Sequence, residues 1–597
     1  MKSILPALRY LGKHKWKVVL SLLTVVAANL AALLAPYILR LGIDAIEAGR
    51  GAGSLWIYGV GLMLAASVEG LFRFWSRYLG NAVSRDVEYE LRNDLFRHLQ
   101  RQDAAFFQRW RTGDLMARAT NDLNSVQRAL GPGISNLANT LIAFVGTVAV
   151  MLTIDVRLAL YSALILPLMS LIFAFTGRVI QRRFEKVQEG FSDISTRVQE
   201  NASGIRVVKA YAQEAPELEQ FRHTNRQYMS ASIAHLRIQA LLWPAMFTVG
   251  GIATVVVLYF GGRDVIAGRI SVGQLVQFIA YVGALRWPMI ALGWVMNLVQ
   301  QGAASMARLQ SVLNTQPAIR DEQPAAVSRL RGEIEFRNVS LRHGHATVLS
   351  EINLRIPAGS TVAVVGPTGS GKSSLAALVP RLWDPSEGQV CVDGIDVRLI
   401  PLELLRRSVG YVPQETFLFS EPLRENIAYG VDSTSQERIE WAAAVSQLQR
   451  DVEQFPQGYE TYLGERGVTL SGGQKQRTAI ARAVLKDPTI LILDDALSAV
   501  DTYTEEEILR RLKDVMETRT SLIISHRVST VQHADEIVVL DDGRIVEQGT
   551  HDELVRLDGL YASMYRRQLL AEELDVDPED EQIQLSPSPD GKAPAGA

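Results

Sequence analysis

The sequence has almost no cysteine and no strong excess of charge of either sign. Cys391 is the only cysteine among 597 residues, which excludes an internal disulfide. Lysine and arginine together number 61 against 64 acidic residues, so the formal net charge is only −3. The basic residues flank apolar segments and do not form one stripe with stacking aromatics, a pattern that argues against nucleic-acid binding.

Apolar residues, by contrast, make up 48% of the chain and gather in long blocks in its first half. A helix needs about 20 mostly apolar residues to cross a bilayer core about 30 Å thick. Six segments meet this requirement: 16–39, 55–78, 130–154, 158–176, 241–260 and 272–298. We therefore predict a membrane domain of six transmembrane helices.

Charged residues in and beside these spans constrain how the helices are placed. Arg40, Glu69, Arg73 and Arg286 would be accepted poorly on an isolated lipid-facing helix, so we expect them to face inward. Glu69, Arg73 and Arg286 either line a solvated cavity, or form structural ion pairs or extend toward a helix end. The stretches before the first span and between the second and third spans are rich in lysine and arginine, which predicts that they are cytoplasmic.

A glycine-rich segment in the second half of the chain is typical of a phosphate-binding loop. The sequence GPTGSGKSS at 366–374 follows an apolar run and fits the pattern G-x-x-x-x-G-K-[ST]. Glycines allow backbone N–H groups to close around phosphate oxygens, while Lys372 reaches the β and γ phosphates and Ser373 ligates Mg²⁺. The pattern predicts ATP and Mg²⁺ as cofactors. The predicted nucleotide-binding residues of this segment are Gly366, Thr368, Gly369, Ser370, Gly371, Lys372, Ser373 and Ser374.

A second metal ligand follows the apolar run at 490–493. That run is typical of a buried parallel strand, whose carboxyl end delivers a side chain to the ligand crevice. Asp494 stands at its end, and Mg²⁺ usually binds through one or two carboxylates plus substrate phosphates. We therefore predict Asp494 and Ser373 as metal ligands.

Between these two elements, residues 470–474 read LSGGQ, the signature of ATP-binding cassette (ABC) proteins, and the second half of the chain resembles that family. The resemblance implies dimerisation, because two nucleotide domains of this family bind head to tail and the signature of one caps ATP on the other. The hydroxyl and backbone donors of such a loop stabilise the charge of the γ-phosphate. The residues expected to act on the partner's ATP are Leu470, Ser471, Gly472, Gly473 and Gln474.

Further residues match the motifs of this family in order. Gln414, in VGYVPQE, is similar to the Q-loop glutamine, which contacts Mg²⁺ and senses the membrane part. His526, in LIISHR, resembles the switch histidine, which contacts the γ-phosphate. The segment SAVD, with Ser498 and Asp501, is similar to the D-loop. The resemblance implies catalytic roles for Asp495, His526 and Gln414, and a metal contact for Gln414.

The sequence departs from the family pattern at two positions. Asp495 stands where the general base of the family is a glutamate, and aspartate is one methylene shorter. A displacement of about 1 Å in positioning water lowers a rate by roughly a hundredfold. His343 falls where the family usually has a tyrosine that stacks on adenine, so it either stacks with its smaller ring or is an ordinary loop residue.

The intact signature beside Asp495 bears on the identity of the partner. It resembles the pattern of the degenerate-site subunit of heterodimeric exporters, such as bacterial multidrug or antigen-peptide-transporter-like exporters. The expected partner is therefore a second ABC half-transporter, with this chain contributing the weak ATP site. A homodimer that uses Asp495 as a slow base is the alternative.

The fold class that the resemblance implies is a multi-span α-helical membrane domain of the type I ABC exporter, fused to an α/β P-loop nucleotide-binding domain with a helical signature subdomain. We expect the membrane domain at 1–310, a linker at 311–332, the nucleotide-binding domain at 333–570 and an acidic disordered tail at 571–597. Segments 106–122 and 200–211 resemble the intracellular loops that dock on nucleotide domains, which predicts mechanical coupling there.

The function that this resemblance implies is ATP-driven export of hydrophobic or amphipathic substrates, such as drugs, lipids or peptides. The protein would cross the cytoplasmic (inner) membrane several times, with its nucleotide domain in the cytoplasm. Its partners would be the lipid bilayer, a second half-transporter and a hydrophobic or peptide substrate, and no nucleic acid. A homodimeric exporter or lipid flippase is the main alternative, and an ATP-gated channel or regulator is a further one. The identity of the substrate cannot be predicted from the spans.

Overall fold

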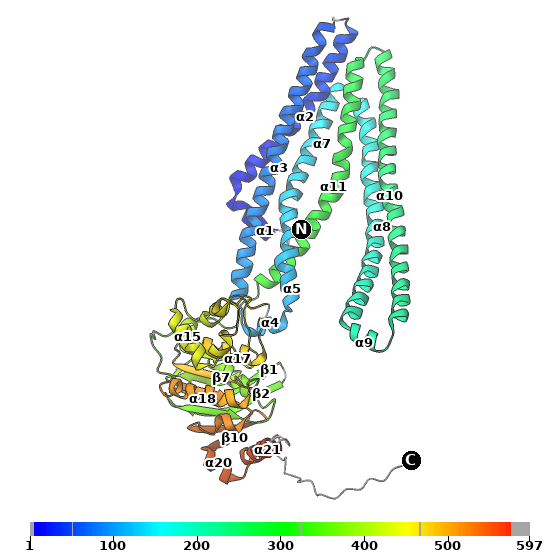
Figure 1. Ribbon diagram of the computed structural model, residues 1–597. Coiled ribbons are helices and arrows are strands. Elements are labelled where there is room, and N and C mark those ends of the chain that lie inside the picture. Colours follow the sequence, from blue (N-terminus) through cyan, green and yellow to red (C-terminus); the bar gives the residue numbers. More distant parts are fainter. Residues whose placement is uncertain (1–4, 50–51, 323, 345, 465–466, 575–597) are drawn as a thin grey trace, which may run out of the picture. The chain divides into compact units, whose positions relative to one another are not determined.

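The computed structural model describes residues 5–49, 52–322, 324–344, 346–464 and 467–574. The chain divides into two compact units (Figure 1). The first comprises Met1–Arg101 and Trp110–Gln316, and the second comprises Gln102–Arg109 and Pro317–Ala597. The first unit is helical, and the second combines helices and strands.

Long helices joined by short helical turns make up the first unit. Its elements are α1 (Leu5–Lys13), α2 (Lys15–Glu47), η2 (Ala52–Ser54), α3 (Leu55–Gln100), α5 (Thr112–Ala117), η3 (Arg118–Asp122), α6 (Leu123–Arg128), η4 (Ala129–Gly133), α7 (Ile134–Ile154), α8 (Val156–Ser203), α9 (Ile205–Ala210), α10 (Glu214–Ile266) and α11 (Val272–Leu313). The wider π-helical turn η4 contains Pro132, which has no N–H to give to a regular helical ladder.

Within the described residues, five helical segments are long and apolar enough to cross a membrane. They are Lys15–Glu47, Leu55–Gln100, Thr112–Ile154, Glu214–Ile266 and Val272–Leu313, and each contains one predicted span. The remaining predicted span, 158–176, lies in the first half of α8, where several side chains are outside the description. The helices extend beyond the apolar spans into charged segments.

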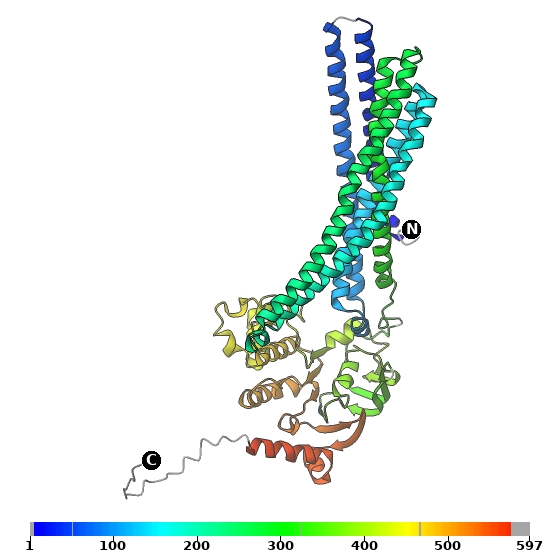
Figure 2. The same cartoon turned by 90° about the vertical axis from the view of Figure 1, so that its right-hand side faces the viewer.

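Helices α8 and α10 lie side by side and are joined through α9, as two perpendicular views show (Figures 1 and 2). Polar contacts hold their charged portions together: Arg197 pairs with Glu217 at 2.8 Å, and the amide of Asn201 donates to Glu217 at 2.9 Å. In α9, which falls in the segment 200–211, Val207 is exposed. The other segment expected to dock, 106–122, is divided between the two units. Its residues up to Arg109 belong to the second unit, where Phe106 of α4 is buried.

The second unit contains two sheets with helices around them. Its elements are α4 (Ala104–Arg109), β1 (Ile334–His343), β2 (Ala346–Ile356), β3 (Thr361–Val365), α12 (Lys372–Leu378), β4 (Glu387–Val392), β5 (Ile395–Asp396), α13 (Leu402–Ser408), β6 (Val409–Val412), α14 (Leu423–Ala428), α15 (Gln436–Val445), α16 (Gln449–Val452), η5 (Gly458–Glu460), α17 (Gly472–Leu485), β7 (Ile490–Asp494), α18 (Thr502–Met516), β8 (Thr520–Ile524), α19 (Val528–Val531), β9 (Glu536–Asp541), β10 (Arg544–Gly549), α20 (His551–Leu557) and α21 (Leu560–Leu574).

One sheet is antiparallel, in the order β2-β1-β4-β5, and the other has the order β10-β9-β3-β8-β7-β6. In the second sheet the strands from β9 to β6 run parallel, and β10 is antiparallel to β9. The predicted strand at 490–493 is therefore confirmed as β7. It is buried along its length because both faces of the sheet are covered.

Side chains of the parallel strands alternate between two hydrophobic cores. Val364 and Ile492 pack in a core that also contains Phe336 of β1, whereas Val365 and Leu493 pack in a core with residues of α17 and α18. A separate small core joins α14, α15 and α17 into a helical subdomain. The sheet thus holds the carboxyl ends of β3 and β7 on one edge, where the predicted site lies. Most of the predicted tail, from residue 575 onward, lies outside the described residues.

Candidate nucleotide site

The predicted nucleotide-binding residues surround one cleft in the second unit. Its volume is about 570 Å³, within the range of about 300–1,000 Å³ that ligand sites usually have. The lining residues are His343, Val348, Thr368, Gly369, Gly371, Lys372, Ser373, Ser374, Gln414, Asp494, Asp495, Ile524 and His526. Gly366 and Ser370 belong to the same loop behind this lining, and the signature and D-loop residues lie outside it.

The phosphate-binding loop runs from the end of β3 to the start of α12 and depends on glycine. Gly366, Gly369 and Gly371 have φ of 149°, 85° and 101°, a region that side chains rarely adopt. A Cβ at Gly371 would lie 2.8 Å from the carbonyl oxygen of Val348, so this position also requires the missing side chain. The loop therefore has the close-turned backbone that presents N–H groups to a phosphate.

Lys372 lies folded over this loop. Its ammonium donates to the carbonyl oxygens of Gly366 at 2.9 Å and Pro367 at 2.8 Å. Burial lowers the pKa of Lys372, and the nearby carboxylates of Asp495 and Asp494 oppose this effect. Among the described residues it forms no ion pair, so a phosphate would supply the negative charge that the buried ammonium lacks.

Asp494 is 2% exposed at the end of β7 and has hydroxyl partners. Ser373 donates to its Oδ1 at 2.9 Å, and Tyr411 donates to its Oδ2 at 3.4 Å. Burial raises the pKa of Asp494, and the two hydroxyl hydrogen bonds act in the opposite direction. A buried carboxylate is unfavourable without a cation, so Asp494 and Ser373 fit a hard divalent cation such as Mg²⁺.

The residues expected to be catalytic meet at the mouth of the cleft. Nδ1 of His526 lies 2.8 Å from Oδ1 of Asp495, and the amide of Gln414 donates to Oδ2 of Asp495 at 3.4 Å. The backbone N–H of Asp495 donates to Ile524 at 2.8 Å, and its φ is 50°. Both oxygens of the Asp495 carboxylate therefore have side-chain partners from two other loops. Gln414 contacts Asp495 in this structure, beside the expected metal position.

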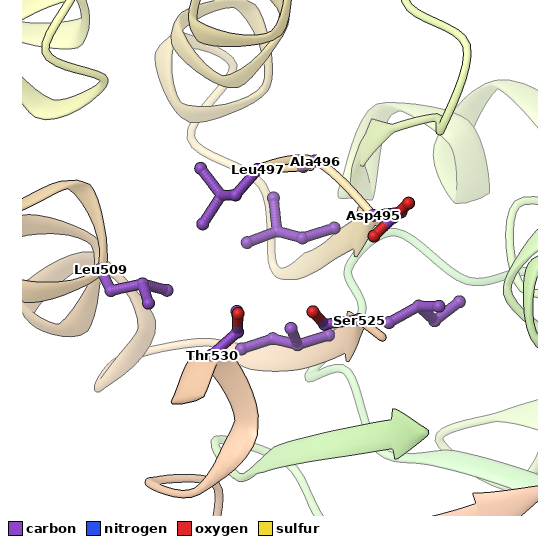
Figure 3. Close-up of a pocket in the computed structure, with 9 residues that line it drawn as sticks. Asp495, Ala496, Leu497, Leu509, Ser525 and Thr530 are labelled. Carbon is purple, nitrogen blue, oxygen red and sulfur yellow. The ribbon is translucent and has the colours of Figure 1, made fainter. Parts of the chain in front are cut away.

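The D-loop, residues 498–501, follows closely after Asp495 and is tied to the signature helix through Gln476. Ser498 donates from its hydroxyl to the Asp495 carbonyl at 3.0 Å. The buried side chain of Gln476 donates to the Ser498 hydroxyl at 2.9 Å and accepts from the N–H of Ala499 at 2.9 Å. Just before the D-loop, Ala496 and Leu497 line an apolar pocket to which Leu509 of α18 also contributes (Figure 3). Asp501 ends the loop by accepting from the N–H of Thr504 at 2.9 Å.

The signature residues form the capped start of α17. Ser471 accepts from the N–H of Gln474 at 3.3 Å, while the Gln474 side chain accepts from the N–H of Ser471 at 3.0 Å. This reciprocal capping box fixes the entry of the helix. The amide of Gln474 also donates to Asp451 at 3.0 Å. Leu470 is buried beneath the turn, whereas Ser471 and Gly472 are exposed at its tip.

His343 lies at the rim of the cleft, and its ring packs edge-on against Trp383 with centroids 4.5 Å apart. The stacking of His343 on adenine stays a prediction. The sequence patterns do not predict Trp383, Tyr411 and Gln476 as residues of the site. Tyr411 had a signal, because it stands three residues before Gln414 on a strand that pairs with β7.

Arg527, next to His526, holds the switch segment to the D-loop and α18. It donates to Glu505, which is 3% exposed and also accepts from the hydroxyl of Thr530. Arg527 further donates to the carbonyl of Val500 at 3.5 Å. This pair of a half-buried arginine and a buried glutamate thus connects the switch segment, the D-loop and α18.

Replacing Arg527 by alanine is expected to destabilise the second unit, because the buried Glu505 carboxylate loses its cation. Breaking such a pair costs about 3–5 kcal/mol of unfolding free energy, which lowers the thermal midpoint by roughly 6–12 °C or more. Arg510→Ala, which removes a solvent-exposed partner of Glu507, is the control and should shift the midpoint by less than about 4 °C. Equal small shifts in thermal unfolding of the two purified variants would show that the network does not stabilise the fold.

Comparisons with known proteins agree with this geometry. The family described as ABC transporter transmembrane region matches residues 18–289, and the family described as ABC transporter matches residues 349–498. A solved structure of a bacterial Atm1-family ABC exporter with ATP bound is similar with a TM-score of 0.78 and 30% identity, covering 93% of this chain and 98% of that one.

Curated relatives match over nearly the whole length. The probable multidrug resistance ABC transporter ATP-binding/permease protein YheI of Bacillus subtilis is 35% identical, with 96% of this chain and 98% of that protein covered. The multidrug resistance-like ATP-binding protein MdlA of Escherichia coli is 36% identical, with 96% of each covered. The ATP-dependent lipid A-core flippase of Desulfotalea psychrophila is 35% identical over 84% of this chain and 88% of that one.

These matches confirm the predicted fold class and the prediction of ATP-driven transport. The membrane region matches the first half of the chain, and the cleft with its phosphate-binding loop belongs to the second. This chain therefore belongs to the ABC transporter family, as a multi-pass membrane exporter whose cytoplasmic nucleotide domain binds ATP and couples its hydrolysis to transport.

Proposed function

We propose that this chain is one half of a heterodimeric exporter and contributes the weak ATP site. The observation that supports the proposal is the environment of Asp495, a short carboxylate whose two oxygens already contact His526 and Gln414. Such a base is poorly placed to orient water, while the signature turn of the same chain is intact and capped. The signature would then serve the competent site, which is built on the P-loop of the partner.

The roles that we assign follow the geometry of the cleft. Lys372 and the glycine loop bind the phosphates, and Ser373, Asp494 and Gln414 hold Mg²⁺. The ion, when bound, neutralises charge on the β and γ phosphates. His526 contacts the γ-phosphate, and Asp495, one methylene shorter than the family's glutamate, orients water poorly.

The remaining assignments concern adenine binding and the boundaries of the domains. His343 stacks on adenine, and its edge-on contact with Trp383 supports the position of its ring. The membrane domain extends over 1–310, the linker over 311–332 and the nucleotide-binding domain over 333–570.

For the cargo, we propose a hydrophobic or amphipathic molecule exported across the cytoplasmic membrane. Two of the relatives are named for multidrug resistance and one for flipping a lipid, which supports a drug-like or lipid substrate. The long apolar helices of the first unit suit such molecules, because their spans carry few charges. The test is ATP-dependent uptake of a fluorescent amphipathic dye into inverted vesicles against a gradient, which a pump performs and an ATP-gated channel does not.

Asp495→Glu is expected to raise ATP turnover at this chain's own site by roughly tenfold to a hundredfold, because about 1 Å of extra reach improves the placement of water. Since the partner's competent site already supplies the turnover of the assembled transporter, the total rises at most about twofold once the two sites are comparable. Asp495 lines the cleft, where its carboxylate already lies beside His526 and Gln414. Asp514→Glu, an exposed position on α18, is the matched control and should leave turnover unchanged. If steady-state turnover of Asp495→Glu equals that of the wild type, Asp495 does not limit the rate.

A further inference from the structure

Arg286 differs from the other charged residues of the predicted spans in its partners. Arg40 pairs with Asp44 at 3.3 Å, and Arg73 pairs with Glu69. Glu69 and Arg73 thus form an ion pair, and Arg73 also lines a pocket with Phe74 and Tyr78. Arg286 forms no ion pair within the part of the chain that the structure describes, and the spans 241–260 and 272–298 contain no acidic residue in their sequence.

The guanidinium of Arg286 contacts neutral groups of α10 instead. Its Nη2 donates to the carbonyl of Gly250 at 3.1 Å and to the hydroxyl of Thr254 at 3.0 Å. Its Nε is buried without an acceptor. A Cβ at Gly250 would lie 2.8 Å from this Nε, so the glycine provides the space in which the guanidinium lies. Guanidinium has five N–H donors, so both its charge and part of its donor capacity remain unmatched.

Two large apolar side chains near Arg286 on α11 are exposed, although Leu285 and Met289 beside it are buried. Trp287 is 63% exposed and Trp294, two helical turns further along the same face, is 48% exposed. A charge in the middle of a span is rare unless it faces a polar cavity or a ligand. One polar anchor among large apolar side chains is the composition of a site for an amphipathic molecule.

We propose that Arg286 binds the anionic headgroup of an amphipathic substrate, while Trp287 and Trp294 contact its apolar body. The inference rests on the proposed export function and adds to it a class of substrate. Both N–H groups of Nη2 are used on α10, so a carboxylate or phosphate accepts from Nη1, which has no protein partner within the described residues, and neutralises the charge, whereas a cationic amphiphile is repelled. The headgroup that binds Arg286 belongs either to a free single-chain amphiphile or to a resident anionic lipid of the bilayer.

The test uses the purified, assembled transporter in phosphatidylcholine nanodiscs. The probes are lauroyl lysophosphatidylglycerol and lauroyl lysophosphatidylcholine, which share the chain and differ in net charge. Binding is followed by tryptophan fluorescence, and ATP turnover is measured beside it. We expect the anionic probe to bind the wild type about tenfold more tightly, as one charge-assisted contact predicts. Arg286→Gln should abolish this preference, and Arg286→Lys should retain most of it.

Arg157→Gln, an exposed arginine outside the spans, is the control and should keep the preference. Nanodiscs of phosphatidylglycerol distinguish an added amphiphile from a resident anionic lipid. If the resident lipid is the ligand, these discs raise basal ATP turnover of the wild type but not of Arg286→Gln. The added anionic probe then has no further effect on turnover. Equal binding of the two probes by the wild type, or an unchanged preference in a correctly assembled Arg286→Gln, overturns the proposal. A charge preference in binding, combined with no ATP-dependent uptake into inverted vesicles, would instead contradict the export function alone.

Discussion

Gly473→Ala is expected to lower ATP turnover of the assembled transporter by roughly a hundredfold, because it displaces a positioned loop by a fraction of an ångström to 1 Å. A Cβ at Gly473 would lie 2.9 Å from the carbonyl oxygen of Ala499. That oxygen belongs to the backbone of the D-loop, which Gln476 holds in place through the N–H of Ala499. The signature turn and the D-loop must therefore move apart, and the capped turn then presents its donors to the ATP of the partner in the wrong place.

Two measurements make this prediction specific. Gly430→Ala is the matched control, since a Cβ there would meet only the flexible side chain of Lys486, at 3.5 Å or more. Nucleotide trapping by the chain's own P-loop should persist in Gly473→Ala, because its phosphate-binding loop is untouched. Wild-type turnover in Gly473→Ala, or a loss of turnover accompanied by a loss of nucleotide trapping, would contradict the assignment of the signature to the partner's site.

Lys372→Ala is expected to weaken ATP binding at this chain's own site by roughly tenfold to a hundredfold. Hydrogen bonds to a charged group contribute about 1.5–3 kcal/mol, which corresponds to that range of dissociation constants. In the present structure the ammonium is held by the carbonyls of Gly366 and Pro367, so it is already positioned over the loop that would receive the phosphates. Photolabelling of this chain with an azido-ATP analogue measures the affinity directly.

The control for this variant is Lys513→Ala, which removes an exposed ammonium from α18 and should leave labelling unchanged. Equal labelling of Lys372→Ala and the wild type would show that the ammonium does not bind phosphate. Gly473→Ala and Lys372→Ala together also distinguish a heterodimer from a homodimer. In a heterodimer with its weak site here, Gly473→Ala lowers turnover more than Lys372→Ala, whereas in a homodimer both abolish it.

The parts of the site that the sequence predicts well are those encoded by local spacing. The glycines at 366, 369 and 371 have the positive φ that their pattern requires, and Asp494 lies at the end of a buried strand beside Ser373. The capping of α17 was equally readable, since Ser471 and Gln474 have the S-x-x-Q spacing of a capping box. The resemblance implies a role for these residues at the partner's ATP, and in the structure they also cap α17 within the chain.

The parts that the sequence does not predict depend on contacts between distant segments. Gln476 of α17 contacts the D-loop, and Arg527 contacts Glu505 of α18. No local pattern in the sequence indicates that these segments are neighbours. The charges of the spans are a similar case. The i to i+4 spacing of Glu69 and Arg73 permits an ion pair, but the neutral partners of Arg286 come from another helix.

The most direct test of the central claim, that this chain is the weak half of a heterodimer, is ATP turnover by the chain purified alone in lipid. Its assembly mass and an Asp495→Ala variant are measured beside it. We predict a nearly inactive preparation, little affected by Asp495→Ala, whose activity is restored by co-expression of a related half-transporter. Steady turnover by a dimer of identical chains, abolished in Asp495→Ala, would contradict the claim and establish a homodimer in which aspartate suffices.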